Sequence, residues 1–288
     1  VDGEPEVIKQ WIGRECDMDK AETIDIPTSI VIIVPHKTNP SCTFAFYLLK
    51  QNLYGKEDKK KHVNPWREKC EYEALCEGDD YWIDPLKLQK QVDFLDNNCE
   101  FTMSYTNANI RNEDKNNVVR RHFKGISGNI TQFLLTKGNP IVTASVCLRT
   151  SVLEQYINDR RKYNLQLKTG DLPLWIYASY KGKVHYLPDS TVLYRVLPSS
   201  VSHIAAPEKM IAFTSNAADI RLYMNKHYNL GAKKEDIYYL HYCMLIKCIS
   251  GFSFKDFQYY LKKYVSEYPK VLLNIRAWLY IFKALLKK

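Results

Sequence analysis

The sequence predicts an α/β fold in which helices flank a mixed sheet and a helical extension follows at the C-terminus. Over roughly the first 205 residues, short runs rich in β-branched residues alternate with segments whose apolar residues recur at helical spacing. Beyond that point only helical periodicity remains. With 288 residues, the chain is long enough to bury a core. We therefore expect two domains, residues 1–205 and residues 206–288.

The individual elements can be placed along the chain in order. Residues 29–34 are apolar and β-branched and predict a buried strand, whereas the polar, basic stretch that follows up to residue 69 predicts a linker. Residues 72–76 predict a short strand that leads into an acidic turn. Asp84 followed by Pro85 predicts a helix start, because Asp caps helix N-termini and Pro is tolerated in the first turn. Later strands are expected at residues 101–105, 141–148, 184–187 and 191–194, the last two around a Pro-Asp turn, and helices at residues 171–180, 211–228, 235–249, 254–264 and 271–286.

The composition indicates which partners the protein binds and in which cellular compartment we expect it. Lys and Arg number 41 against 32 Asp and Glu, and this surplus favours anionic partners, although the basic run at residues 56–61 is typical of a solvated face. The eight cysteines form no CxxC pair, so we expect reduced thiols in a cytoplasmic protein. No apolar stretch approaches the length needed to span a bilayer.

The acidic turn carries the strongest chemical signal. Glu77, Asp79 and Asp80 lie within four positions, and clustered carboxylates repel one another unless a cation or protons neutralise them. Hard oxygen ligands favour Mg²⁺ or Mn²⁺, which commonly bridge a diphosphate. The alternative is an acidic turn that only caps the following helix.

The segment ALCEGDDYWIDPLKLQKQ at residues 74–91 resembles the signature of bacterial family 2 glycosyltransferases, which have the GT-A fold, a Rossmann-like mixed sheet. The resemblance implies a nucleotide-sugar donor, most simply a UDP-sugar, bound together with Mg²⁺ or Mn²⁺. It implies that Asp79 contacts the metal directly and that Glu77 and Asp80 complete the cofactor site.

A second segment, TGDLPLW at residues 169–175, is similar to the family's GDxPLW stretch. It implies that Asp171 is the general base, since an inverting transferase must remove a proton from the attacking acceptor hydroxyl. Taken alone, Asp171 is equally compatible with a simple helix cap. A weaker similarity, from Tyr194-Arg195 to Ser202-His203, implies that Arg195 and His203 lie near the donor diphosphate.

The N-terminal part resembles the family less closely, because it contains no PTYN-like turn. The segment WIGRECDMD at residues 11–19 is similar to a family segment that contacts the nucleotide, and this implies that Glu15 or Asp17 reads the uracil or ribose. Alternatively, residues 30–36 form the first strand of the fold. In either case we expect an altered nucleotide pocket.

Two functions follow from these observations. The first is an inverting, metal-dependent glycosyltransferase that builds lipopolysaccharide, capsule or exopolysaccharide on a glycan or lipid-linked acceptor. The alternative is a non-catalytic GT-A-fold binding or scaffold protein that has lost donor recognition. A nucleic-acid partner is not expected, because no basic stripe with aromatic platforms is present. The basic, apolar tail at residues 270–288 predicts peripheral contact with an anionic membrane surface or packing against the body.

Overall fold

The computed structural model describes residues 5–50, 64–67, 69–113, 117–120, 125–197, 207–249 and 254–267, together with four isolated residues near the C-terminus. It shows an α/β protein with two compact units, Val1–Glu68 and Lys69–Lys288, and each unit is described by itself. The boundary expected near residue 205 stays a prediction. His203, the basic run at residues 56–61 and most of the tail at residues 270–288 lie outside the described residues.

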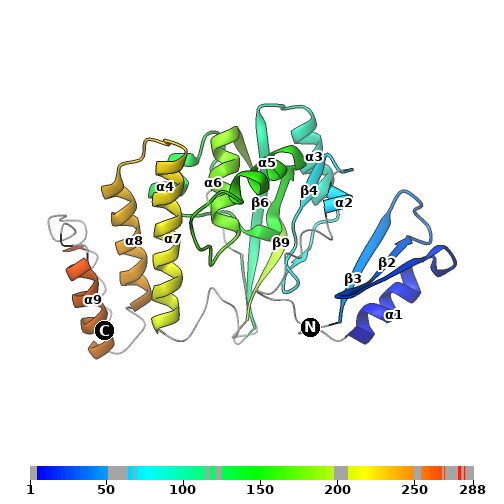
Figure 1. The fold of residues 1–288 in the computed structure, drawn as a ribbon, viewed down its shortest axis with the longest axis horizontal. Coiled ribbons are helices and arrows are strands. Elements are labelled where there is room, and N and C mark those ends of the chain that lie inside the picture. Colours follow the sequence, from blue (N-terminus) through cyan, green and yellow to red (C-terminus); the bar gives the residue numbers. More distant parts are fainter. Residues whose placement is uncertain are drawn as a thin grey trace. The chain divides into compact units, whose positions relative to one another are not determined.

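The first unit is a three-stranded antiparallel sheet with one helix packed on it (Figure 1). The elements in chain order are α1 (Pro5–Glu15), the 3-10 turn Met18–Lys20, β1 (Glu22–Ile26), β2 (Ser29–Pro35), β3 (Thr43–Leu49) and the short α2 (Asn64–Arg67). Ile12 and Cys16 of α1 are buried against Val34, and the Trp11 ring meets the Phe44 ring edge-on at 5.1 Å. The strand expected at residues 29–34 is thus confirmed, but the linker expected after it was wrong, because β3 occupies part of it.

The second unit contains a mixed sheet, as the sequence predicted. Its strand order is β4-β8-β6-β9-β5, and β7 pairs with β6. Among the described strands of this sheet, only β6 and β9 run parallel to each other, and the other neighbouring strands are antiparallel. The strands are β4 (Tyr72–Ala74), β5 (Tyr81–Trp82), β6 (Phe101–Asn112), β7 (Asn117–Arg120), β8 (Val146–Arg149) and β9 (Lys183–Val196).

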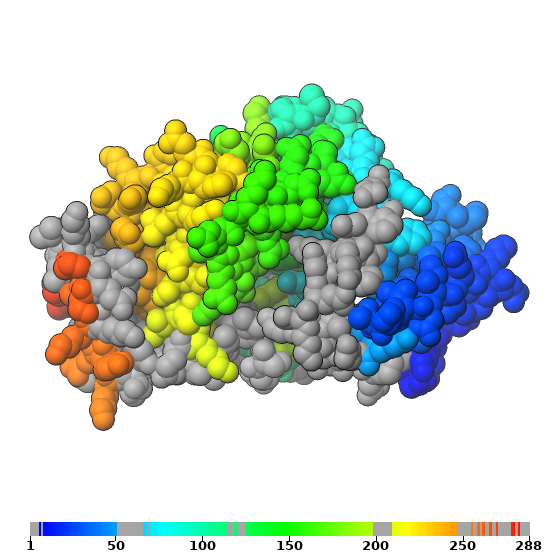
Figure 2. Space-filling model, viewed as in Figure 1, coloured from blue at the N-terminus to red at the C-terminus, as the bar shows by residue number. Residues whose placement is uncertain are grey.

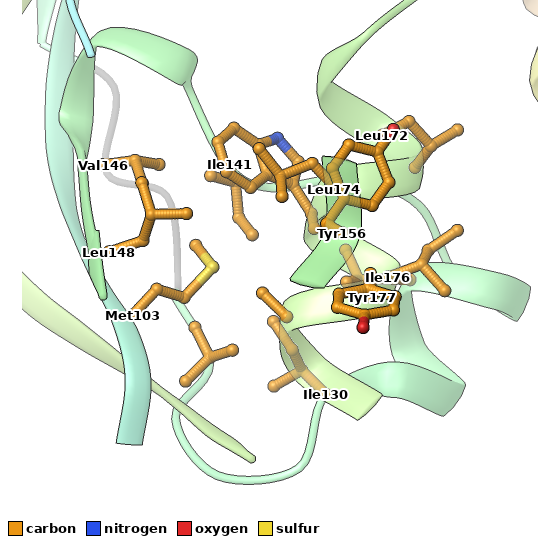
Figure 3. Close-up of a cluster of buried hydrophobic side chains, with 14 of the residues drawn as sticks. Met103, Ile130, Ile141, Val146, Leu148, Tyr156, Leu172, Leu174, Ile176 and Tyr177 are labelled. Carbon is orange, nitrogen blue, oxygen red and sulfur yellow. The ribbon is translucent and has the colours of Figure 1, made fainter. Parts of the chain in front are cut away.

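Helices cover both faces of this sheet. On one face, Met103 of β6 and Leu148 of β8 belong to an apolar cluster that includes side chains of four helices. These helices are α4 (Thr131–Thr136), α5 (Thr150–Arg160), α6 (Asp171–Lys181) and α7 (Pro207–His227). Figure 3 shows both residues with Tyr156, Leu172, Leu174, Ile176 and Tyr177 of this cluster. On the other face lies α3 (Lys87–Asp96), whose Gln91 donates to the backbone oxygens of Ser104 and Ser145. Ser104 follows Met103 directly, so it points to the opposite side of the strand.

Three of the four expected C-terminal helices are present, and the fourth, expected at residues 271–286, lies mostly outside the described residues. The helix α8 (Lys234–Ile249) packs on α7, and α9 (Phe254–Glu267) follows. Of the tail, the structure describes Trp278, Leu279 and Phe282, which are at least half exposed (50%, 58% and 66%). None of the described helices combines the length and the apolar character needed to cross a membrane.

Three local expectations were wrong in detail. The helix after the acidic turn begins at Lys87 rather than near Asp84, because Asp84 instead accepts the N–H of Leu86 in a preceding turn. Only the last part of residues 141–148 is a strand; a 3-10 turn, Thr143–Ser145, comes before it. The two short strands expected at residues 184–187 and 191–194 are one continuous strand, β9, because β6 pairs with it on both sides of the Pro-Asp pair.

Candidate functional site

The acidic turn of the second unit lies between β4 and β5. The N–H of Asp80 donates to the carbonyl of Glu77 at 3.0 Å and closes the turn. The Cys76 thiol lies 3.6 Å from the carbonyl oxygen of Asp80, across the same turn. The local sequence therefore forms a tight loop that presents several carboxylates at the end of a strand.

Asp80 anchors this turn to β9. Its side chain is only 8% exposed, and its Oδ1 accepts the backbone N–H of Arg195 at 2.8 Å. The pKa of the Asp80 carboxyl is raised to about 6, because burial and the negative charge of Asp79 together outweigh the lowering effect of the Arg195 hydrogen bond and charge. The second oxygen, Oδ2, is buried without a hydrogen-bond partner among the residues that the structure describes. A buried carboxylate oxygen in this state favours a proton or a cation.

Glu77 is the carboxyl group most affected by its surroundings. Solvent reaches the side chain, but the protein atoms around it remove part of its hydration. This desolvation is the largest cause that raises the pKa of Glu77 to about 7, followed by the negative charges of Asp80, Asp171 and Asp79. The charge of Asp171 therefore acts on the acidic turn through Glu77.

Asp171 is the first residue of α6. Its Oδ1 accepts the hydroxyl proton of Thr169 at 2.5 Å, and the N-cap position belongs to Gly170. The rest of the helix is firmly fixed, because Leu172 to Ser179 are all buried. The sequence alternative, Asp171 as the capping residue, is therefore not what the structure shows.

Arg195 connects β9 with the acidic turn through its side chain as well. Its Nε donates to Oε1 of Glu113 at 2.7 Å, and its Nη1 lies 3.4 Å from the carbonyl oxygen of Asp79. The Arg195 hydrogen bond holds the pKa of Glu113 below its usual range. Glu113 was not among the residues singled out from the sequence, since nothing in its local sequence points to Arg195.

The carboxylates of the turn fit a divalent cation that shares its coordination with a ligand. Within the described ranges, no group of three or more His, Cys, Asp or Glu side chains converges on a point that could hold a metal. Mg²⁺ usually binds proteins through one or two carboxylates and takes its remaining ligands from phosphates and water. Asp79 and its sequence neighbour Asp80, whose buried Oδ2 has no hydrogen-bond partner among the described residues, supply the two carboxylates that this requires.

The residues expected to read the nucleotide lie in the other unit. Glu15 is at the end of α1, where Arg14 Nε donates to it at 2.6 Å and His36 Nε2 lies 4.0 Å from its other oxygen. Asp17 pairs with Lys20 at 2.8 Å, and this hydrogen bond lowers the pKa of Asp17. The structure joins Glu77, Asp79, Asp80 and Arg195 through hydrogen bonds around the acidic turn, and the charge of Asp171 acts on Glu77. The functional roles of these residues and of Glu15, Asp17 and His203 stay predictions.

Comparisons with known proteins give little more. The chain matches no protein-family model. It is similar to uncharacterised proteins of Mycobacterium bovis and Mycobacterium tuberculosis, with 57% identity over 44 residues. That segment is 15% of this chain, and the chain spans only 13% of the length of these curated relatives.

Proposed function

We propose that the chain is an inverting, metal-dependent glycosyltransferase of the GT-A type that acts in the synthesis of a surface polysaccharide. One observation supports this above all: the acidic turn contains a buried oxygen of Asp80 that has no hydrogen-bond partner among the described residues, and the charge of Asp171, from a separate part of the second unit, acts on Glu77 of the same turn. An inverting transferase needs a base on one side of the reacting carbon and charge neutralisation on the other.

The residues divide the chemistry between them. Asp171 removes the proton of an acceptor hydroxyl while that oxygen forms a bond to the anomeric carbon and the bond from this carbon to the diphosphate oxygen breaks. Asp79 and Asp80 would hold Mg²⁺ or Mn²⁺, which neutralises the departing diphosphate. The Arg195 guanidinium, held by Glu113, adds positive charge on the same side. The donor we propose is a UDP-sugar, and the acceptor is a glycan or a lipid-linked saccharide.

The donor site is tested by calorimetric titration of UDP and GDP with and without Mn²⁺. We expect metal-dependent binding by the wild-type protein and its loss in Asp79→Ala. Asp189→Ala is the matched control, because it removes another carboxylate of the second unit that is exposed and paired with Lys90. Loss of binding in both variants would point to general damage rather than to a donor site.

The base is tested separately. Asp171→Asn keeps the size of the side chain and removes its basicity, so we expect nucleotide binding to persist while sugar transfer falls by about 10²- to 10⁴-fold. Transfer at the wild-type rate would exclude Asp171 as the base.

A second candidate is a non-catalytic binding or scaffold protein. The arrangement of the first unit favours it, because β1, β2 and β3 form an antiparallel sheet rather than parallel strands that lead into a nucleotide pocket. Well-folded wild-type protein that binds no nucleotide in the same titration would exclude the transferase and favour this function.

A further inference from the structure

The segment that leads into Asp171 is held by a residue of the C-terminal helices. Between α5 and α6 the backbone has no regular structure, and it runs beside α7. Figure 2 shows the green surface of α5 and the loop after it lying against the yellow surface of α7. One side chain of α7, Asn216, makes two hydrogen bonds to this loop.

Both ends of the Asn216 amide are used. Its Oδ1 accepts the backbone N–H of Lys168 at 2.8 Å, and its Nδ2 donates to the carbonyl of Gln166 at 2.7 Å. The side chain is 8% exposed, so water competes little for either bond. Asn216 thus fixes the loop backbone at two points.

The clamped backbone ends next to the proposed base. Thr169 follows Lys168 directly, and its hydroxyl donates to Oδ1 of Asp171 at 2.5 Å. A shift of the loop would therefore move the Thr169 hydroxyl and change the orientation of the Asp171 carboxylate.

The helix that carries the clamp is itself anchored in the core. Ala217, Ile220 and Met224 of α7 belong to the main apolar cluster. Arg221 is 3% exposed and donates through Nε to the carbonyl of Leu134 at 2.8 Å. A side chain on this helix is thus a firm support for a loop that has no regular structure.

We propose that Asn216 is a positioning residue for Asp171 and acts through residues 166–169. This inference rests on the proposed function. It assigns to α7 a part in catalysis, although no residue of α7 was expected to belong to the site.

The helix supplies its own control. Asn225 makes the same kind of bond pair near the C-terminal end of α7: its Nδ2 donates to the carbonyl of Ala232 at 2.8 Å, and its Oδ1 accepts the N–H of Ala232 at 2.9 Å. Asn216→Ala and Asn225→Ala therefore remove equivalent bonds from one helix, and we expect similar losses of thermal stability. Only Asn216→Ala alters the support of Asp171.

Sugar transfer separates the two variants. We expect kcat of Asn216→Ala to fall about 10- to 100-fold, because small misplacements of a catalytic group have effects of that size, with little change in KM for the donor or in the Mn²⁺-dependent affinity for UDP. Asn225→Ala should keep the wild-type kcat. Asn216→Asp retains the bond from Lys168 and loses the one to Gln166, so its kcat should lie between those of Asn216→Ala and Asn225→Ala. It serves as the second variant if Asn216→Ala does not fold. Equal kcat for Asn216→Ala and Asn225→Ala would overturn the inference.

Amide hydrogen exchange tests the clamp without any need for activity. In Asn216→Ala the amide of Lys168 should exchange faster than in the wild type, whereas in Asn225→Ala the amide of Ala232 should do so. Unchanged exchange at Lys168 would overturn the clamp even in an active enzyme. A wild-type protein that binds nucleotide but transfers no sugar would overturn the positioning role, and one that binds no nucleotide would overturn the proposed function itself.

Discussion

The Asp80 side chain joins two parts of the second unit that are 115 positions apart in the sequence, through its bond to the N–H of Arg195. It does so at an electrostatic cost, since one of its oxygens is buried without a hydrogen-bond partner in the described part of the chain. Without a bound cation, burial favours the protonated form of the Asp80 carboxyl over its ionised form, in contrast to a carboxyl group in water.

Asp80→Asn should therefore stabilise the protein above pH 6. The pKa of Asp80 is raised from 3.8 to about 6 in the folded protein, so the unfolded chain loses its proton first and the free energy of unfolding falls as pH rises between these values. The Asn side chain keeps an acceptor for the Arg195 N–H and removes the charge. We expect a gain on the order of 1–3 kcal/mol at pH 8, measured by urea unfolding, that vanishes below about pH 4.

Asp84→Asn is the control with the opposite sign. The Lys90 ammonium and the Leu86 N–H lower the pKa of Asp84, so its ionised form supports the fold and its replacement should destabilise the protein at pH 8. An Asp80→Asn variant that loses stability at pH 8, as Asp84→Asn does, would contradict the account given for Asp80.

Residues of the site differ in how far the sequence predicts them. Glu77, Asp79 and Asp80 can be identified from the sequence because they lie within four positions, and the structure places them in one tight turn, where their role as a site stays a prediction. Glu113 and Asn216 carry no such signal, since the partner of Glu113 is 82 positions away and that of Asn216 is 50 positions away. An Asn or Glu that acts through a distant backbone or side chain has the same local sequence as one on a solvated surface.

Among the helices and strands, the spacing of apolar residues predicted an element correctly where its surroundings stay the same along its length. The helices α6, α7 and α8 were expected within a few residues of their observed ends. The prediction failed at β9, where Pro188 and Asp189 are typical of a turn. The strand continues through them because β6 supplies a parallel partner on both sides, with register shifts near Thr106 and Asn107. Tertiary pairing thus outweighs the local turn preference.

The packing of α8 on α7 should make the stability of the protein depend on pH through His241. This side chain is 3% exposed, and burial together with the positive charge of Arg221 lowers its pKa from 6.5 to about 4. The unfolded chain takes up a proton first as pH falls, so stability present above pH 6.5 is lost toward pH 4. We expect a loss on the order of 3 kcal/mol between these values from His241 alone.

Urea unfolding of His241→Phe between pH 4 and pH 7 tests this dependence. The variant retains a ring in the buried position and cannot be protonated. Its free energy of unfolding should therefore fall less steeply on acidification than that of the wild type. Equal slopes would mean that His241 is solvated in the folded protein, contrary to its position.

At the scale of the whole molecule, the division after Glu68 separates the acidic turn and Asp171 from Glu15 and Asp17. The fragment Lys69–Lys288 contains its own core and should unfold cooperatively in urea. If Glu15 or Asp17 contacts the nucleobase, the fragment should retain Mn²⁺-dependent diphosphate binding but lose any preference for UDP over GDP. A fragment with the full preference would place base recognition in the second unit.

The α/β class and the mixed sheet were predictable because alternating strand and helix patterns cover most of the second unit. The separate antiparallel sheet of the first unit was not. The β1 strand has four exposed residues of five, so it lacks the apolar run that marked β2. The segment expected to contact the nucleotide, residues 11–19, covers the end of α1 and the turn after it, and its buried residues Ile12 and Cys16 pack against Val34 of β2.

The parallel pairing of β6 and β9 also sets the order in which a nascent chain assembles this site. During translation the acidic turn leaves the ribosome well before Arg195, so Asp80 stays hydrated until β9 has been made and has docked beside β6. Asp171 precedes β9, but its loop receives its clamp only when Asn216 emerges. Translation that stops before α7 thus leaves a chain that carries Glu77, Asp79, Asp80 and Asp171 but lacks Asn216, whose hydrogen bonds hold the loop that precedes Asp171.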